Sequence, residues 1–426
     1  MIEIKGLSKY EKYKNVDIHW LDKIPAKWEV KRVKDLAFYQ SGEYINALDF
    51  EEENLYPVYG GNGFRGYADR FNTNGNYVLI GRQGALCGNI NYANGKFWAT
   101  EHCVVVYNNK NVNVNWLGAM LEVMNLNQYA QSTAQPGLSV DKIKRVEIPF
   151  LPLQEQTQIA NYLDTKTQAI DKKINLLTTK IEYYKELRKT IINNAVTKGL
   201  DKNVKLKETE LGFDIPTHWK SKRIKDVGFL YSGLSGKAGD DFNQDDNPNN
   251  KGFIPFTNIA NNTYLKKDHL GTVVVFDNEK QNKVRKGDIF FLMSSEGYED
   301  IGKTAVLDDD IKDTYLNSFC KGYRLTKSFC HPSFINYMML STNYRSQLIT
   351  EGKGFTRINL KMEKVTDFIM YLPPTKEEQT EIATYLDAKT STIDKITTNL
   401  QSQIETLKEL RKTLINDVVT GKIKVN

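Results

Sequence analysis

A phosphate-loop pattern in the second half of the chain is the stretch whose spacing points most directly to chemistry. Residues 297–304 read GYEDIGKT, which satisfies the pattern G-x-x-x-x-G-K-S/T of nucleotide-binding NTPases. A phosphate cradle should open a helix, but Thr304 is followed by Ala-Val-Leu and three Asp, which predict a strand and a turn. Glu299 and Asp300 would also place negative charge beside the phosphates. We therefore interpret the stretch as a glycine-containing hairpin, with an NTPase that depends on Lys303 as the alternative.

Cysteine and histidine give little support for a metal site. Cysteines and histidines lie near each other in the sequence in two groups. The first group is Cys87, His102 and Cys103, and the second is Cys320, Cys330 and His331. Neither group has the spacing of zinc ligands, and the four cysteines form no C-x-x-C pair. We predict no metal site, and expect free thiols, buried as small apolar side chains, in a reducing cytosol.

Other signatures of catalysis are missing from the sequence. It has no N/D-P-P-Y/F stretch of the kind that amino-methyltransferases usually carry, no G-x-G-x-x-G pattern and no nuclease-like cluster of carboxylates and lysine. Five histidines in 426 residues offer little for acid–base catalysis. We predict no catalytic residue and expect that the chain itself is not an enzyme.

The composition is that of an ordinary globular protein, with 40% hydrophobic and 26% charged residues. A length of 426 residues suits two or three domains. No apolar run is long enough for a transmembrane helix, and the first residues lack the apolar core of a signal peptide, so we expect a cytoplasmic protein. The net charge of +6 permits an anionic partner without demonstrating one.

One stretch occurs twice and organises the rest of the chain. Residues 154–198 align with residues 377–421 at a constant offset of 223, so that Asp171 matches Asp394. Apolar residues recur every seven positions, and these are Leu163, Ile170, Leu177, Tyr184 and Ile191 in the first copy and Leu386, Ile393, Leu400, Leu407 and Leu414 in the second. This spacing is typical of a coiled coil. We predict two helices, each roughly 60 Å long, that pack on each other, because two unrelated bundle helices would not share sequence.

A second repeat opens the region in front of each helix. The pattern I-P-x-x-W at residues 24–28 recurs at 215–219 with an offset of 191, so the second region is longer by 32 residues. Both regions are predicted to be mixed and mainly β, because short β-type runs alternate with Gly/Asn clusters. The β-type runs are residues 77–80, 104–107, 271–276 and 288–293, and short helices are expected at 115–130 and 332–351. The polar stretch 235–251 is predicted to be a mobile loop.

The sequence also predicts that the two ends of the chain lie close together. Residues 419–423 match residues 196–200, where the chain runs on into the second region, and residues 5–7 look like the continuation of the same junction. The chain is therefore a near-closed cycle, and a pseudo-twofold relation between its halves follows.

Together these features resemble the specificity subunit of type I restriction-modification enzymes, over essentially the whole chain. The resemblance rests on the two E-Q-x-x-I-A-x-Y-L-D helix starts, the K-E-L-R-K-T segments, the I-P-x-x-W entries, the L-P exits and the A/V-V-T tails. The stretches YGGNGFRGY at 59–67 and IGRQG at 80–84 also resemble that family's target-recognition domains, which the second region matches less well.

The resemblance implies an α+β fold. Two mixed, mainly β target-recognition domains would be separated by two long antiparallel coiled-coil helices in a pseudo-twofold, circular arrangement. The implied segments are an N-terminal segment that packs near the C-terminus (1–20), target-recognition domain 1 (21–150), helical spacer 1 (151–200), target-recognition domain 2 (201–371) and helical spacer 2 (372–426).

The resemblance also implies a function. Each domain would read one half of a bipartite site in double-stranded DNA, and the paired helices would fix the spacing and dock two methyltransferase subunits, which restriction/translocase subunits can join. The complex would be an adenine methyltransferase and ATP-dependent nuclease, with S-adenosylmethionine, ATP and Mg bound by partners and no cofactor in this chain. A scaffold that joins two proteins without DNA is the alternative, but it does not explain the Gly/Arg/aromatic-rich domains.

Candidate site residues follow from side-chain chemistry, because Arg and Gln can read base edges bidentately and glycines allow close approach. For DNA contact they are Tyr59, Asn62, Phe64, Arg65, Tyr67, Arg82 and Gln83 in the first domain and Thr257, Asn258, Ser294, Ser295, Lys353, Thr356 and Arg357 in the second. For partner docking they are Gln156, Tyr162, Leu163, Gln379, Tyr385 and Leu386. Packing within the chain is the alternative for these Leu and Tyr residues.

Overall fold

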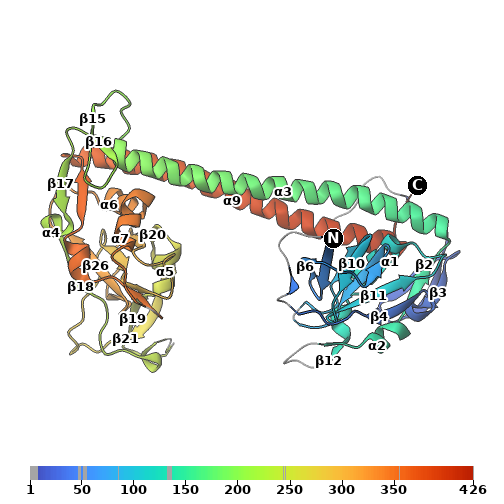
Figure 1. The fold of residues 1–426 in the computed structure, drawn as a ribbon. Helices are drawn as coiled ribbons and strands as arrows, with labels where there is room; N and C mark the ends of the chain where they lie inside the picture. Colours follow the sequence, from blue (N-terminus) through green and yellow to red (C-terminus); the bar gives the residue numbers. More distant parts are fainter. Residues whose placement is uncertain are drawn as a thin grey trace. The chain divides into compact units, whose positions relative to one another are not determined.

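The computed structural model describes residues 8–46, 49–50, 55–84, 86–131, 137–242, 244, 246–354 and 356–425. The chain divides into two compact units, of which the first is Met1–Thr178 together with Leu400–Asn426 and the second is Thr179–Asn399. Each unit contains one β-rich domain and part of each of two long helices, α3 (Leu153–Lys198) and α9 (Lys376–Val419) (Figure 1). Both predicted helices are therefore confirmed, nearly to the residue.

The helices run antiparallel, as each unit shows separately. In the first unit, Ile159 at the start of α3 shares an apolar core with Leu414 and Val418 at the end of α9. In the second unit, Val196 at the end of α3 shares a core with Ile382 at the start of α9. The heptad positions place these residues on one stripe, and burying the stripe is the main source of stability for a helix of this length.

One pair of sequence positions forms an ion pair between the helices in both units. In the first unit, Arg411 Nε lies 3.3 Å from Asp171 Oδ1. In the second unit, Arg188 Nε lies 3.2 Å from Asp394 Oδ1. Arg188 corresponds to Arg411, and Asp171 to Asp394, at the offset of 223. The sequence repeat is therefore also a repeat of contacts.

The β-rich domain of the first unit is built on a sheet with strand order β4-β11-β8-β9 and a second sheet with order β6-β5-β10-β7. Its strands are β1 (Tyr13–Ile18), β2 (Leu21–Pro25), β3 (Glu29–Arg32), β4 (Ala37–Ser41), β5 (Tyr56–Gly60), β6 (Gly63–Ala68), β7 (Thr73–Asn74), β8 (Tyr77–Gly81), β9 (Ile90–Ala93), β10 (Lys96–Ala99), β11 (Cys103–Asn108), β12 (Ala130–Gln131), β13 (Gly137–Leu138) and β14 (Glu147–Phe150). Its helices are α1 (Val114–Val123) and α2 (Val140–Arg145), with short 3₁₀ turns at Val33–Asp35 and Leu126–Tyr129.

The domain of the second unit has a sheet with order β18-β26-β22-β24-β20 and another with order β21-β19-β25. Its strands are β15 (Leu206–Glu208), β16 (Asp214–Pro216), β17 (Lys220–Arg223), β18 (Gly228–Ser232), β19 (Asn250–Ile254), β20 (Tyr264–Leu265), β21 (Gly271–Val274), β22 (Ile289–Leu292), β23 (Ser294–Ser295), β24 (Thr304–Leu307), β25 (Thr314–Leu316), β26 (Cys320–Leu325), β27 (Ile358–Asn359) and β28 (Ile369–Leu372). Its helices are α4 (Ile224–Val227), α5 (Phe256–Asn261), α6 (Pro332–Leu340), α7 (Thr342–Ile349) and α8 (Met362–Thr366), with 3₁₀ turns at Gly239–Asp241 and Lys267–His269.

The central strands are apolar on both faces because each face covers a different core. In β8, Val78 and Ile80 belong to the core that includes α1, whereas Leu79 belongs to the core that includes Phe97. Strand β22 divides in the same way, with Phe291 in one core and Phe290 in the other. The apolar runs at 77–80 and 288–293 thus predicted buried strands correctly.

Two predicted helices end earlier than the sequence indicated. The expected helix at 332–351 is broken at Ser341, whose backbone is extended between α6 and α7 and whose hydroxyl caps α7 by accepting from the Tyr344 amide. The expected helix at 115–130 ends at Val123, where α1 passes into a 3₁₀ turn. Both boundaries depend on the local backbone conformation at single residues, which periodicity alone does not reveal.

The two ends of the described chain meet in the first unit. The Lys424 amide donates to the Ser8 carbonyl at 2.8 Å, and the Tyr13 hydroxyl donates to the Gly421 carbonyl at 3.1 Å. This agrees with the expectation that the termini lie close together. Among the described residues, no helix has the length and apolar character that crossing a membrane requires.

Candidate nucleic-acid interface

Three segments meet at one end of the main sheet in each unit, and we call this end the loop edge. It comprises residues 81–84, 86–89, 100–103 and 137–138 in the first unit and 292–303, 317–320, 353–354 and 356–360 in the second. In the first unit, the Arg82 amide donates to the His102 carbonyl and the Leu138 amide donates to the Arg82 carbonyl, both at 2.8 Å. Backbone bonds therefore hold the three segments together.

The second unit repeats this backbone arrangement with other side chains. The Met293 amide donates to the Phe319 carbonyl at 3.2 Å, and the Leu360 amide donates to the Met293 carbonyl at 2.9 Å. Met293 therefore occupies the position of Arg82, and Phe319 the position of His102. The loop edges share a framework but present different chemistry.

Three of the predicted DNA-contacting residues come together at the first loop edge, and all three are exposed. Arg82 Nη1 donates to Ser41 Oγ at 3.2 Å, and Gln83 forms a backbone bridge with Gly137. Asn62, in the turn between β5 and β6, accepts at its Oδ1 from Asn89 Nδ2 at 3.2 Å. The turn between β5 and β6 and the loop between β8 and β9 thus present polar side chains side by side.

The β5–β6 hairpin carries the predicted aromatic residues. The Phe64 ring centroid lies 6.3 Å from that of Tyr59 and 5.1 Å from that of Tyr67. Phe64 is 54% exposed, so its ring is available for stacking. Burial, with a smaller contribution from Tyr67, raises the pKa of Tyr59, which keeps its hydroxyl neutral as a donor. The Arg65 guanidinium lies 5.9 Å from the Phe50 ring.

The second loop edge gathers five predicted residues, of which two are buried and three are exposed. Ser294 and Ser295 are buried and pair in β23 with β27, so their contribution is to the ladder and not to the surface. Lys353, Thr356 and Arg357 are exposed, and the Arg357 guanidinium lies 4.5 Å from the ring of Phe319. Arg357 Nη2 is also 3.9 Å from Glu296 Oε1. Charged and aromatic groups thus lie together on an accessible surface.

Thr257 and Asn258, which are predicted to contact DNA, lie in helix α5. Thr257 is exposed, whereas the Asn258 amide donates to the His269 carbonyl and so fixes the loop behind α5. The preceding strand β19 pairs in parallel with β25 as β5 pairs with β10, so α5 stands where the first unit has its β5–β6 hairpin. Their contact with DNA stays a prediction.

The phosphate-loop pattern forms no helix start. Strand β24 begins at Thr304, whose side chain is buried, and Lys303 Nζ donates to Asp300 Oδ1 at 2.7 Å and to the Ala260 carbonyl at 3.2 Å. The lysine is thus bound to an aspartate in the same turn. The interpretation of 297–304 as part of a glycine-containing hairpin agrees with the antiparallel pairing of β22 with β24.

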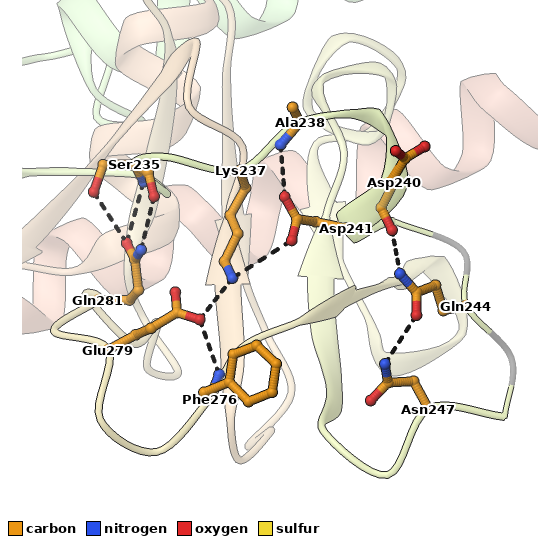
Figure 2. A network of polar contacts seen from close by, with 10 residues as sticks. All are labelled: Ser235, Lys237, Ala238, Asp240, Asp241, Gln244, Asn247, Phe276, Glu279 and Gln281. Atoms are coloured by element: carbon orange, nitrogen blue, oxygen red, sulfur yellow. Dashed lines mark hydrogen bonds and ion pairs between the residues drawn. The ribbon is translucent and has the colours of Figure 1, made fainter.

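A lysine clasp braces the polar stretch that the sequence predicted to be a mobile loop. Lys237 Nζ lies 2.7 Å from Glu279 Oε1 and 3.7 Å from Asp241 Oδ1, and its side chain is only 6% exposed (Figure 2). Glu279 also accepts from the Phe276 amide at 3.1 Å, and this paired carboxylate has a lowered pKa, first because of Lys237. The clasp joins the segment after β18 to the segment after β21.

The predicted docking glutamines are fully buried and bonded within the chain. Gln156 Oε1 accepts from the Asn113 amide at 2.8 Å, and its Nε2 donates to the Leu151 carbonyl at 2.7 Å. Gln379 makes the same contacts in the second unit, with the His331 amide at 2.8 Å and the Pro373 carbonyl at 3.0 Å. Burial closes these side chains to a partner, so their observed role is to join each helix start to its own domain.

The other predicted docking residues differ in exposure. Leu163 and Leu386 belong to the apolar cores, which agrees with the alternative of packing within the chain. Tyr162 and Tyr385 are partly exposed, and a lysine one turn later lies 5.7 Å from each ring. Docking through the two tyrosines stays a prediction.

The four cysteines lie inside the domains. All four are free and buried, and burial raises the pKa of Cys103 to about 12 and that of Cys330 to about 11. Thiols with such pKa values stay protonated near neutral pH. Within the part of the chain that the structure describes, no three His, Cys, Asp or Glu side chains gather as metal ligands.

Comparison with known proteins identifies the family. The family model described as the type I restriction modification DNA specificity domain matches residues 25–182 and 216–406. The chain belongs to the type I specificity subunits. It is 43% identical to the EcoprrI specificity subunit of Escherichia coli over 138 residues, which are 32% of this chain and 34% of that relative. It is 22% identical to the MjaVIII specificity subunit of Methanocaldococcus jannaschii over 100% of this chain and 99% of that relative.

Two solved structures share the fold. A chain from a structural study of complex assembly and conformational transition of the type I R-M system aligns with 93% of this chain and 99% of its own length, with a TM-score of 0.69 and 14% identity. The HsdS subunit of Thermoanaerobacter tengcongensis aligns with 93% of this chain and 98% of its own length, with a TM-score of 0.50 and 14% identity. The expected α+β fold, with two β-rich domains and α3 packed with α9, is confirmed.

Sequence reasoning missed two residues at the second loop edge. Lys321, the second residue of β26 and the first after the loop edge, is partly exposed and donates from Nζ to Ser232 Oγ at 2.7 Å. Phe319 is 47% exposed in the turn before β26. A signal was present, because Cys103 and Cys320 align the strands β11 and β26 at an offset of 217. At this offset Lys321 is equivalent to Val104, and it therefore lies beside Ser232, as Val104 lies beside Ser41.

Proposed function

We propose that this specificity subunit reads a bipartite site in double-stranded DNA, one half with each β-rich domain. The observation that carries the proposal is the repeat of one framework with two different surfaces. Each unit has the same backbone-bonded loop edge, but Arg82 in the first stands where Met293 stands in the second. Two readers with different side chains suit two different half-sites.

The helices α3 and α9 would set the distance between the two half-sites. A rigid connection is needed, because a flexible one would blur the gap between the contacted bases. Buried heptad positions and the repeated Arg–Asp ion pair support such a connection. The same helices offer equivalent seats for two methyltransferase subunits, to which nuclease/translocase subunits can be added.

The chemistry would belong to those partners. We propose that the chain is not catalytic, and that adenine methylation with S-adenosylmethionine and ATP-driven, Mg-dependent cleavage take place in the other subunits. An adenine must leave the base stack to be methylated, so this chain would hold the duplex while its partner flips the base. We place the complex in the cytoplasm.

A binding selection tests the proposal. The chain is purified with its methyltransferase partner and enriches a random duplex library at physiological salt, because salt sets the non-specific background. We expect a motif in two different halves, separated by a fixed gap of unread bases. A single continuous motif would leave one domain without a role in reading, and no enrichment at all would favour a protein scaffold instead.

A further inference from the structure

The two loop edges each hold one cation against a serine at the same position of the sheet. Ser41 ends β4 and pairs with Val104 of β11, and Ser232 ends β18 and pairs with Lys321 of β26. The register therefore makes Ser41 equivalent to Ser232 and Val104 equivalent to Lys321. This equivalence comes from strand pairing and does not depend on side-chain similarity.

The cation at this serine comes from a different strand in each unit. In the first unit it is Arg82, at the end of β8, which bonds to Ser41 over the buried Val104. In the second unit the position of Arg82 holds Met293, which is buried, and the cation is Lys321. A cation and an apolar residue have exchanged places between two neighbouring strands. In both units, therefore, one positively charged side chain is hydrogen-bonded to the equivalent serine.

Both cations keep their charge available. Among the described residues, neither Arg82 nor Lys321 forms an ion pair, and each is fixed by a neutral hydroxyl. Arg324 on the same strand as Lys321 differs, because its guanidinium lies 2.6 Å from the buried Asp288 carboxylate. A hydroxyl takes up one donor and limits the motion of a long side chain, while the remaining donors stay free to meet acceptors.

We propose that Arg82 and Lys321 are equivalent readers, each of which contacts a guanine in its own half-site, with Ser41 and Ser232 as positioning residues. The inference rests on the proposed function, that each unit reads DNA. Guanine presents two acceptors, N7 and O6, on its major-groove edge, and arginine or lysine is their commonest partner. The exposed Gln83 in the first unit and Phe319 in the second lie beside these cations and extend the contact surface.

The exchange between strands provides the test. The complex with the methyltransferase partner is titrated, by fluorescence anisotropy, with the selected duplex and with duplexes changed at one base pair. We expect Lys321→Val to reduce the preference for one G·C pair of one half-site by roughly 10-fold to 100-fold, the range of a good base contact. The double variant Met293→Arg/Lys321→Val rebuilds the first unit's arrangement and should restore that preference. Arg82→Met should act on the other half-site alone.

Matched controls lie at the opposite ends of the same strands. Lys110 and Lys327 stand two residues beyond β11 and β26, at the offset of 217 that relates these strands, and both are exposed. Alanine at either should leave base preference unchanged, and unchanged melting temperatures will show that all variants fold. If Lys321→Val weakens all duplexes equally and lowers the salt slope by about one, the lysine contacts a phosphate and the inference is overturned. Relaxation at a pair other than G·C would overturn it as well. Failure of the wild-type complex to select any site would instead refute the proposed function.

Discussion

At the scale of single residues, each of the two buried glutamines at the starts of α3 and α9 connects its long helix to the neighbouring β-rich domain. Gln156 and Gln379 use both ends of the side-chain amide on backbone groups of the preceding strand exit and of a neighbouring helix start. No water reaches these groups, because both glutamines are fully buried. Loss of either amide leaves buried donors and acceptors without partners, which is more costly than loss of an exposed hydrogen bond.

Gln156→Ala is therefore expected to lower the stability of the first unit by about 1–3 kcal/mol. The measurement is urea unfolding, followed by circular dichroism, beside the wild type. Gln154→Ala is the control, because this glutamine is exposed at the same helix start. Equal unfolding midpoints for Gln156→Ala and the wild type would contradict the role given to the buried amide.

The lysine clasp predicts a dependence on pH. Because Lys237 lowers the pKa of Glu279 below its ordinary value of 4.5, the clasp stabilises the folded loop above that value and is lost as the pH falls through the folded pKa. Glu279→Gln should therefore increase amide hydrogen exchange in residues 235–241 at pH 7 and have little effect near pH 3. The exposed Glu299→Gln is the control. A difference between Glu279→Gln and wild type that is the same at both pH values would rule out the ion pair as its cause.

At the scale of elements, the sequence predicted what depends on local pattern. Heptads predicted α3 and α9, and apolar runs predicted β8, β11 and β22. These patterns are visible in the sequence because the residues that an element buries recur at the spacing of its backbone. Arg82 and Gln83, which were predicted to contact DNA, are exposed at the first loop edge, and their contact with DNA stays a prediction. The helix break at Ser341 escaped prediction, because one capping hydroxyl decides it.

Other features of the site depend on contacts between distant residues. The burial of Ser294 and Ser295 follows from pairing with residues more than sixty positions away in the chain. Lys321 reaches the surface at Ser232 only through the register between β18 and β26. No local pattern encodes such a register, so a candidate list made from residue types alone includes buried serines and omits the lysine.

One surface of α3 predicts where a partner docks. Tyr183 is 72% exposed and Leu187 is 45% exposed, which is unusual for apolar side chains one turn apart on a helix that has a packing partner. We expect Tyr183→Ala/Leu187→Ala to weaken binding of the methyltransferase subunit at least tenfold without a change in melting temperature. Lys185→Ala is the control, because this exposed residue is two positions from Tyr183 and therefore points in another direction from the helix. Unchanged affinity in a pull-down titration would remove this face from the docking surface.

At the scale of the whole molecule, the two ends of the described chain meet in the first unit. Residues from both ends build that unit, and the Ser8–Lys424 bridge holds them together. The corresponding junction in the second unit is continuous, and Gly199 and Gly421 both adopt a left-handed backbone, with φ of +71° and +76°, just beyond the two helices. The continuous junction after α3 in the second unit thus corresponds to the place after α9 where the described ends of the chain meet in the first unit.

A permuted chain tests this equivalence. A short Gly/Ser linker between residues 425 and 8, with new ends opened between Gly199 and Lys205, should give a protein that melts within a few degrees of the wild type. It should also select the same DNA motif with the methyltransferase partner. A variant opened inside α3, for example after Leu176, interrupts a heptad and should unfold at lower temperature. Equal loss of stability in both permuted variants would argue against the equivalence of the two junctions.

The repeated ion pair has a consequence for how new versions of the protein arise. Arg188 with Asp394 and Arg411 with Asp171 are interchangeable by position, and so are the glutamine joints at the two helix starts. A genetic crossover within the repeated helix sequence would therefore join a complete domain from another gene to these helices. The ion pairs and glutamine contacts that hold the domain and the helices would already be present. On the proposed function, descendants would acquire a different half-site in one recombination event, with no compensating substitution in the helices.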